Sequence, residues 1–159
     1  MTVRLMPALT GIVVLAVWLG AAALVAGVVA PAAFAVLPTR TLAGALVGRV
    51  LPAIFWSGMV LAVAVIVLIR ASGAGNLGIV GAIITFAGCA IAQLVISPRI
   101  ERIRAAIAGP VDALDLNDPR RLEFGRLHGM SVLAMGVAGL GAILAMAMLI
   151  RHVAARNAG

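Results

Sequence analysis

VLPAIFWSGMVLAVAVIVLI, residues 50–69, contains no ionisable side chain, and Arg49 and Arg70 flank it directly. An α-helix needs about 20 predominantly apolar residues to cross the hydrocarbon core of a bilayer. Because 64% of the residues are hydrophobic and small domains leave much of their surface exposed, a soluble fold of this size could not bury so much apolar surface. The stretch therefore predicts a transmembrane helix.

Three further runs share these properties. None of them contains a charged residue, and they cover about residues 8–30, 77–96 and 129–150. Pro31 is expected to end the first run, because proline disfavours the helical conformation of the residue before it, and Ser97-Pro98 is expected to bound the third. The sequence thus predicts an all-α fold, a four-helix transmembrane bundle that forms a single domain over residues 1–159.

The composition supports lipid as the solvent. Of the 159 residues, 64% are hydrophobic and 11% are charged, whereas a soluble domain carries about 25% charged residues. All twelve basic residues are arginines, and they lie between and beyond the apolar runs. This placement is typical of interface anchors that face the anionic headgroups of membrane lipids, and it argues against nucleic acid as a partner.

The connections between the runs differ in length. Residues 71–76 form a short glycine-rich turn, which predicts an antiparallel hairpin of the second and third helices. Residues 38–49 form a longer connection, and residues 98–128 form the longest, which holds all five acidic residues.

The longest connection has helical features of its own. Ile100, Ile103 and Ile107 recur at helical spacing among charged residues, which predicts an amphipathic interfacial segment before the fourth helix. Asn117-Asp118-Pro119 places a capping side chain before a proline, so the fourth helix is expected to begin near Pro119.

The arginine distribution predicts the orientation. The two longer connections and their flanks carry eight arginines, and the opposite side carries four: Arg40, Arg49, Arg99, Arg102, Arg104, Arg120, Arg121 and Arg126 against Arg4, Arg70, Arg151 and Arg156. By the positive-inside rule the longer connections are cytoplasmic and both termini are outside. The expected location is a bacterial inner membrane, crossed several times.

The first candidate site lies where the fourth helix enters the membrane. Arg121, Phe124, His128 and Ser131 share one helical face, because they are three or four positions apart. An ionisable residue at the edge of the apolar zone is a functional candidate, and His128 has the chemistry to move a proton, bind a metal or ligate a haem. The alternative is an interfacial histidine that hydrogen-bonds a neighbouring helix.

The second candidate is the arginine-rich segment after the third run. Arg99, Arg102 and Arg104 lie within two turns and suit lipid phosphate or another anion. Glu101 is spaced to pair with Arg104, and Glu123 is a candidate partner for Arg99. The alternative is an interfacial segment held by snorkelling arginines, which we favour for Arg102 and Arg104.

A third group contains prolines and one amide. Pro38 and Arg40 follow the first run, and Pro52 lies one turn inside the second, where it frees a backbone carbonyl to line a polar cavity or simply kinks the helix. Gln93 lies inside the third run, so its amide must find a partner. The full set of candidate site residues is His128, Arg99, Arg102, Arg40, Arg121, Glu123, Phe124, Pro38, Pro52, Pro98 and Gln93.

Several motifs of enzymes and metal proteins are missing from the sequence. It has no cysteine pair, no phosphate-binding glycine loop and no nucleophile elbow, so we lean against an enzyme. A haem b held by two histidines of one chain would need His128 and His152, which lie at opposite ends of one membrane run.

Short motifs distributed along the chain resemble a known family. They are Leu37-Pro38, Leu51-Pro52 with Phe55, Pro98-Arg99, and Phe124 with Leu127-His128-Gly129 and Ser131. In their order relative to the four runs they are similar to the transmembrane-protein-205-like family, in bacteria a domain of unknown function (number 4149). The resemblance implies a four-helix membrane protein and implies no activity. The positions that match the family pattern are Pro38, Pro52, Pro98, Arg99, Phe124 and His128.

We therefore expect a small membrane protein that binds or passes a lipid, a small solute or an ion at the face holding Pro38, Arg99 and His128. One alternative is a haem- or metal-binding redox protein that uses His128 as its ligand. Another is an accessory subunit of a larger membrane complex, or a homo-oligomer, that associates through its glycine and alanine faces.

Overall fold

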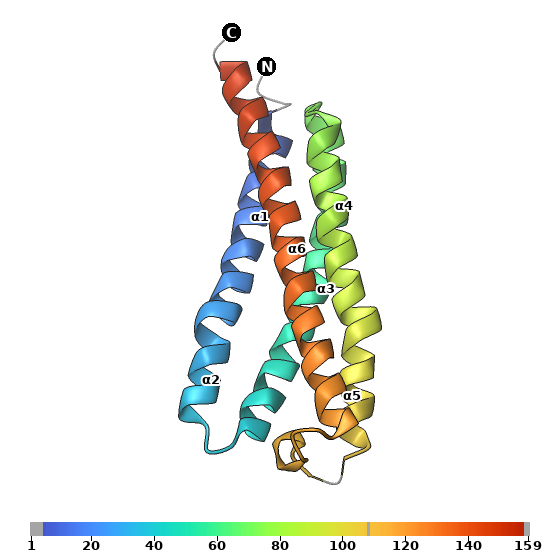
Figure 1. Cartoon of the computed structure of the whole chain (residues 1–159). Helices are drawn as coiled ribbons and strands as arrows, with labels where there is room; N and C mark the ends of the chain where they lie inside the picture. The colour runs from blue at the N-terminus through green and yellow to red at the C-terminus, as the bar shows by residue number, and fades with distance from the viewer. Residues whose placement is uncertain (1–4, 108, 158–159) are drawn as a thin grey trace.

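A computed structural model describes residues 5–107 and 109–157, and every regular element in these ranges is helical (Figure 1). The elements are α1 (Leu5–Leu24), η2 (Val25–Val29), α2 (Ala30–Val36), α3 (Arg40–Ser72), α4 (Asn76–Ala90), η3 (Ile91–Ile96), α5 (Ser97–Ala105), η4 (Val111–Ala113) and α6 (Pro119–Asn157). Successive elements merge into four long helices: Leu5–Val36, Arg40–Ser72, Asn76–Ala105 and Pro119–Asn157. We call these the first to fourth membrane helices.

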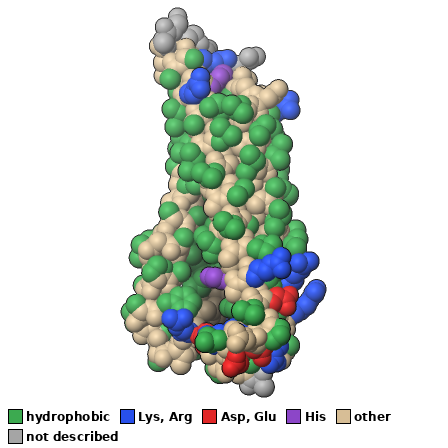
Figure 2. Space-filling view, in the orientation of Figure 1, with side chains coloured by type: hydrophobic (Ala, Val, Ile, Leu, Met, Phe, Trp, Pro, Cys, Tyr) green, Lys and Arg blue, Asp and Glu red, His purple; other side chains and the backbone are tan. Residues whose placement is uncertain are grey.

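The outer surface of the bundle is apolar. Figure 2 shows hydrophobic side chains along the length of the molecule and charged side chains gathered at its two ends. Val60 and Leu133 are each 70% exposed on this surface, which would be costly in water but is favourable against lipid tails. The four predicted spans are thus confirmed, and the chain is an all-α, multi-pass integral membrane protein.

Glycines bring the third and fourth membrane helices into backbone contact. A Cβ atom on Gly81 would lie 2.6 Å from the Gly141 carbonyl oxygen, and one on Gly88 would lie 2.7 Å from the Ala134 oxygen. Thr85 strengthens the contact, because its hydroxyl donates to the Ala138 carbonyl at 3.1 Å across the helices. Small residues are the usual means by which helices approach closely in lipid.

A buried tryptophan joins the first membrane helix to the second. The indole Nε1 of Trp18 donates to the Ile54 carbonyl at 3.0 Å. Gly58 makes room for this ring and for Cys89, since a Cβ there would lie 2.8 Å from the Trp18 ring and 2.6 Å from the Cys89 sulfur. Cys89 is buried, as expected of a small apolar residue in the core.

Pro31 and Pro98 do not end their helices, which corrects the predicted boundaries. Each follows a π-helical turn, η2 or η3, in which a backbone N–H bonds to the carbonyl five residues earlier rather than four. In η2 the Ala30 N–H donates to Val25 O, and in η3 the Ser97 N–H donates to Ala92 O. The widened turn accommodates a proline ring and its missing N–H, so the helix continues. The amphipathic segment α5 therefore extends the third membrane helix directly (Figure 1).

The connection predicted over residues 38–49 is mostly helical. Its helix, α3, already begins at Arg40, because the Thr39 hydroxyl accepts the Leu42 N–H at 3.2 Å and caps the first turn. The other two boundaries agree with the sequence: α6 begins at Pro119, and the α3–α4 hairpin turns at Gly73, whose φ of 76° suits glycine. The N- and C-terminal ends of the bundle lie together, opposite the α5–α6 connection (Figure 1).

Candidate functional site

A cavity of about 660 Å³ lies at the end of the bundle away from the termini. Figure 2 shows a hollow in the surface there, with a histidine side chain at its edge. The cavity is lined by Phe34, Arg40, Thr41, Gly44, Ala45, Val47, Gly48, Leu51, Pro52, Gln93, Ser97, Pro98, Ile100, Glu101, Arg104, Gly109, Pro110, Val111, Asp112, Phe124, His128 and Ser131.

Three helical faces with a spacing of three or four residues form most of this lining. On α3 the face carries Arg40, Gly44, Gly48 and Pro52; on the third membrane helix it carries Gln93, Ser97, Glu101 and Arg104; on α6 it carries Phe124, His128 and Ser131. Residues at this spacing lie above one another on one side of a helix. The cavity is therefore the space enclosed where three such faces converge.

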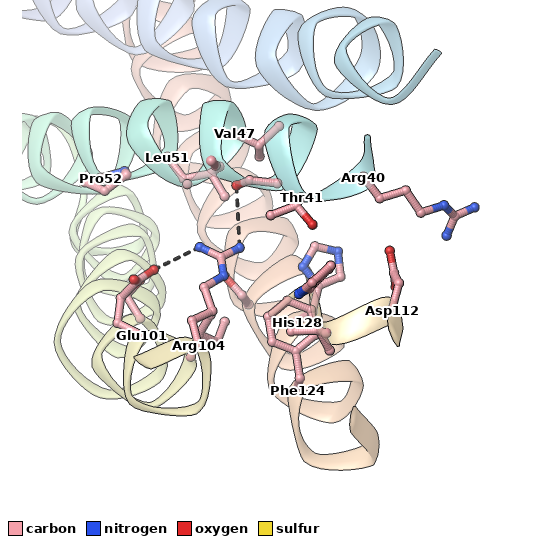
Figure 3. A pocket seen from close by; sticks show the side chains of 18 of the residues that line it. Arg40, Thr41, Val47, Leu51, Pro52, Glu101, Arg104, Asp112, Phe124 and His128 are labelled. Carbon is pink, nitrogen blue, oxygen red and sulfur yellow. Dashed lines mark hydrogen bonds and ion pairs between the residues drawn. The ribbon is translucent and has the colours of Figure 1, made fainter. Parts of the chain in front are cut away.

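Arg104 is the most strongly held charged group of the cavity. Its Nη1 bonds to Glu101 Oε1 at 2.9 Å, its Nη2 lies 3.5 Å from the Gly44 carbonyl oxygen, and its Cζ lies 5.5 Å from the centre of the Phe124 ring. Figure 3 shows the guanidinium directed at α3, with both polar contacts drawn. The predicted pair of Glu101 with Arg104 is confirmed.

Two glycines of α3 make room for this guanidinium. A Cβ on Gly48 would lie 3.0 Å from Arg104 Nη1, and one on Gly44 would lie 3.5 Å from Nη2. Pro52, one turn further along α3, lacks the N–H that would otherwise bond to the Gly48 carbonyl. At Gly44 and Gly48, α3 therefore contributes backbone carbonyls rather than side chains to the polar part of the cavity wall.

A buried polar atom lies at the inner end of the cavity. The Oε1 atom of Gln93 is buried and has no hydrogen-bond partner among the described residues. The nearby Ser97 hydroxyl is engaged, since it donates to the Ala92 carbonyl at 3.0 Å within the η3 turn. An unpaired buried amide oxygen is costly, and a ligand carrying a donor would satisfy it.

His128 lies at the open side of the cavity. Its side chain is exposed, and its imidazole lies beside Phe124 and below Thr41 in Figure 3. No group of three His, Cys, Asp or Glu side chains in residues 5–107 and 109–157 is placed to hold a metal ion. A haem in this cavity would have His128 as its one imidazole ligand, because no other histidine lines it.

Arginines outside the cavity order its loop. Arg121 Nη1 donates to the Leu114 carbonyl at 2.7 Å and to the Asp112 carbonyl at 3.3 Å, which fixes the loop that carries Asp112. Hydrogen bonds from the Arg120 guanidinium and from its backbone N–H lower the pKa of Asp118 to about 2. Asp118 thereby caps the first turn of α6.

The structure brings about half of the predicted site residues together. The cavity is lined by Arg40, Pro52, Gln93, Pro98, Phe124 and His128; it is not lined by Pro38, Arg99, Arg102, Arg121 and Glu123. Arg99, Arg102 and Glu123 are exposed, and Arg99 forms no ion pair with Glu123 in the described part of the chain. Arg104, which the sequence placed in the second candidate site but not in the full set, lines the cavity and continues the face that Gln93 begins. Asp112 was missed.

The fold and the cavity together define a small four-helix membrane protein with a mixed polar and apolar pocket at one end. The chain belongs to the family described as Domain of unknown function (DUF4149), whose sequence profile matches residues 13–109. This confirms the family resemblance over residues 13–109; the motif with Phe124 and His128 lies outside the match. No curated protein and no solved structure matches the chain.

Proposed function

We propose that this protein binds an amphipathic molecule of the bilayer in the cavity at the end of the bundle. The observation that carries the proposal is the composition of the walls, which combine apolar side chains such as Val47, Leu51 and Phe34 with the charged groups Arg40 and Arg104. A volume of about 660 Å³ lies within the range of small-molecule sites. This volume suits a lipid headgroup and the adjoining part of an acyl chain.

The route into the cavity supports a ligand that comes from the membrane. The lining includes Phe34 of α2 and Ser131 of α6, and α2 diverges from α6 toward this end of the bundle (Figure 1). A molecule entering between these two helices would keep its apolar part in lipid while its headgroup reaches the charged residues. Such a path needs no passage through the closely packed α4–α6 contact.

We further propose that the cavity faces the cytoplasm of a bacterial cell and that both described termini face outward. Seven of the eight arginines of the longer connections lie on α3, α5 or the first turns of α6, at the cavity end, and the eighth, Arg126, lies two turns into α6. Arg4, one of the four arginines counted on the opposite side of the membrane, lies outside the described residues. The orientation follows the positive-inside rule, and a C-terminal alkaline phosphatase fusion that is inactive in cells would contradict it.

The binding proposal is tested by filling the cavity. Ala45 lines the cavity and is exposed, so Ala45→Trp adds a large ring there without removing a described polar contact; Ala64→Trp adds the same ring to an exposed position of α3 away from the cavity. Both variants and the parent chain are reconstituted in liposomes with a trace of lipid carrying a diazirine in its acyl chain. The photolabelled peptides are then mapped by mass spectrometry.

We expect the parent and the Ala64→Trp control to carry label on cavity-lining peptides of α3 and α6, and Ala45→Trp to lose most of it. Equal labelling of all three proteins would show that lipid contacts only the outer surface.

The haem alternative for His128 stays a prediction. A visible absorption band in protein made with ample haem, lost in His128→Ala, is the result that would favour it.

A further inference from the structure

The charged groups that line the cavity are balanced in sign. Among the described lining residues, Arg40 and Arg104 are cations and Glu101 and Asp112 are anions. They come from three different segments: α3, α5 and the loop that contains η4. A site built for a simple anion would gain nothing from two carboxylates, because like charges at close range repel the ligand.

The two arginines differ in how firmly they are held. Arg104 is bonded to Glu101 at 2.9 Å and covers the Phe124 ring. Arg40 is exposed at the first turn of α3, and no carboxylate of residues 5–107 and 109–157 lies within ion-pairing distance of it. Its guanidinium therefore remains available for a phosphate, which it can bind through two parallel N–H donors.

A carboxylate stands on the same side of the cavity as Arg40. Figure 3 shows Asp112 extending from its loop toward α3, the helix that carries Arg40. Arg121 holds this loop in place through the Asp112 and Leu114 carbonyls, so the carboxylate is positioned by the fold. The cavity mouth thus presents one cation and one anion that do not neutralise each other.

We propose that the ligand is a zwitterionic phospholipid with a primary ammonium, that is, a lipid of the phosphoethanolamine class. Its phosphate binds Arg40, its ammonium donates to Asp112, and its chains lie along Val47, Leu51 and Phe34. The inference rests on the proposed function of the cavity and adds the chemistry of the headgroup.

The lining also distinguishes a primary ammonium from a quaternary one. Quaternary ammonium groups are bound by cages of aromatic faces. The chain has no tyrosine, and neither tryptophan lines the cavity. Of the two phenylalanines that line the cavity, Phe124 is covered by Arg104. Hydrogen-bond acceptors are present instead near Arg40, namely the Asp112 carboxylate and the Thr41 hydroxyl, and these suit N–H donors.

The test compares three diazirine lipids with identical acyl chains and different headgroups: phosphatidylethanolamine, phosphatidylglycerol and phosphatidylcholine. The full-length protein is reconstituted in nanodiscs with each lipid in turn, and label on cavity-lining peptides is quantified. We expect phosphatidylethanolamine to label about fivefold more than either other lipid, which is the scale of a single exposed charge interaction.

Two variants assign the headgroup contacts. Asp112→Asn is expected to remove the preference for phosphatidylethanolamine over phosphatidylglycerol, because it removes the partner of the ammonium. Arg40→Gln is expected to lower labelling by both lipids, because both carry the phosphate. Asp115→Asn and Arg49→Gln change the same charges at positions that do not line the cavity, and they should retain the parent preference.

The outcomes separate the headgroup inference from the proposed function. Equal labelling of the cavity by the three lipids would overturn the inference and leave lipid binding intact. Stronger labelling by phosphatidylglycerol would also overturn it, in favour of an anion site. Absence of label from cavity peptides with every lipid would overturn both. A thermal melt of each variant, compared with the parent, confirms that labelling is measured on folded protein.

Discussion

At the scale of single residues, Arg102 and Arg104 have different environments although they are two positions apart. Arg102 is exposed, whereas Arg104 is bonded to Glu101 and stacked on Phe124. A helix turns by about 100° per residue, so two positions separate side chains by roughly 200°. The interfacial segment that we favoured for both arginines describes Arg102 but not Arg104, because the helical face of Arg104 also carries Gln93 and lines the cavity.

Gly88 provides the residue-scale prediction. Gly88→Ala would place a Cβ 2.7 Å from the Ala134 carbonyl oxygen and 2.9 Å from the Ala138 Cβ, so the third and fourth membrane helices must separate. We expect a loss of about 1–3 kcal/mol in the free energy of unfolding, measured by circular dichroism during titration with dodecyl sulfate. Gly136→Ala, whose Cβ would meet nothing within 4 Å, is the control. An equal effect of both variants would contradict the close contact.

At the scale of elements, the cap of α6 provides a pH-dependent prediction. The pKa of Asp118 is about 2 in the folded chain, below the ordinary value of about 3.9. A lowered pKa means that the cap stabilises the folded state fully above about pH 4 and that this contribution is lost as the pH falls through about 2. Carbon NMR of the Asp118 carboxyl in micelles should give the low midpoint.

A second NMR measurement, of amide protection at the start of α6, provides the control. Asp118→Asn keeps an acceptor for the Arg120 N–H but does not titrate, so the amides at the start of α6 should stay protected in acid in this variant and lose protection in the parent. A carboxyl midpoint near 3.9 in the parent would contradict the cap geometry, because it would mean that the three Arg120 hydrogen bonds to Asp118 do not persist in solution.

The positions of the membrane helices are predictable from the sequence, and their ends are less so. Runs without charge determine the four helices, because lipid satisfies no backbone hydrogen bonds and so favours continuous helix. For the same reason Pro31 and Pro98 do not break their helices. A π-turn before each proline shifts the hydrogen-bond pattern by one residue, so the helix continues although proline has no N–H to donate. No local signal in the sequence distinguishes such a turn from a helix end.

At the scale of the whole molecule, the cavity depends on how the helices diverge. Its three lining faces were predictable in principle, since their residues recur at helical spacing, and the α6 face with Phe124, His128 and Ser131 was predicted. The divergence of α2 from α6 and the position of the Asp112 loop were not, because neither follows from a helical repeat. The loop is held by the Arg121 bonds to two of its carbonyls, seven and nine positions earlier in an irregular segment.

The most direct test of lipid binding in the cavity is a crystal structure of the full-length protein grown in a lipid mesophase. The account predicts elongated density that begins between Arg40 and Asp112, passes Phe34 and Leu51 and leaves the bundle between α2 and α6. A structure in which α2 packs against α6 and side chains fill this space, with lipid density only on the outer surface, would contradict it.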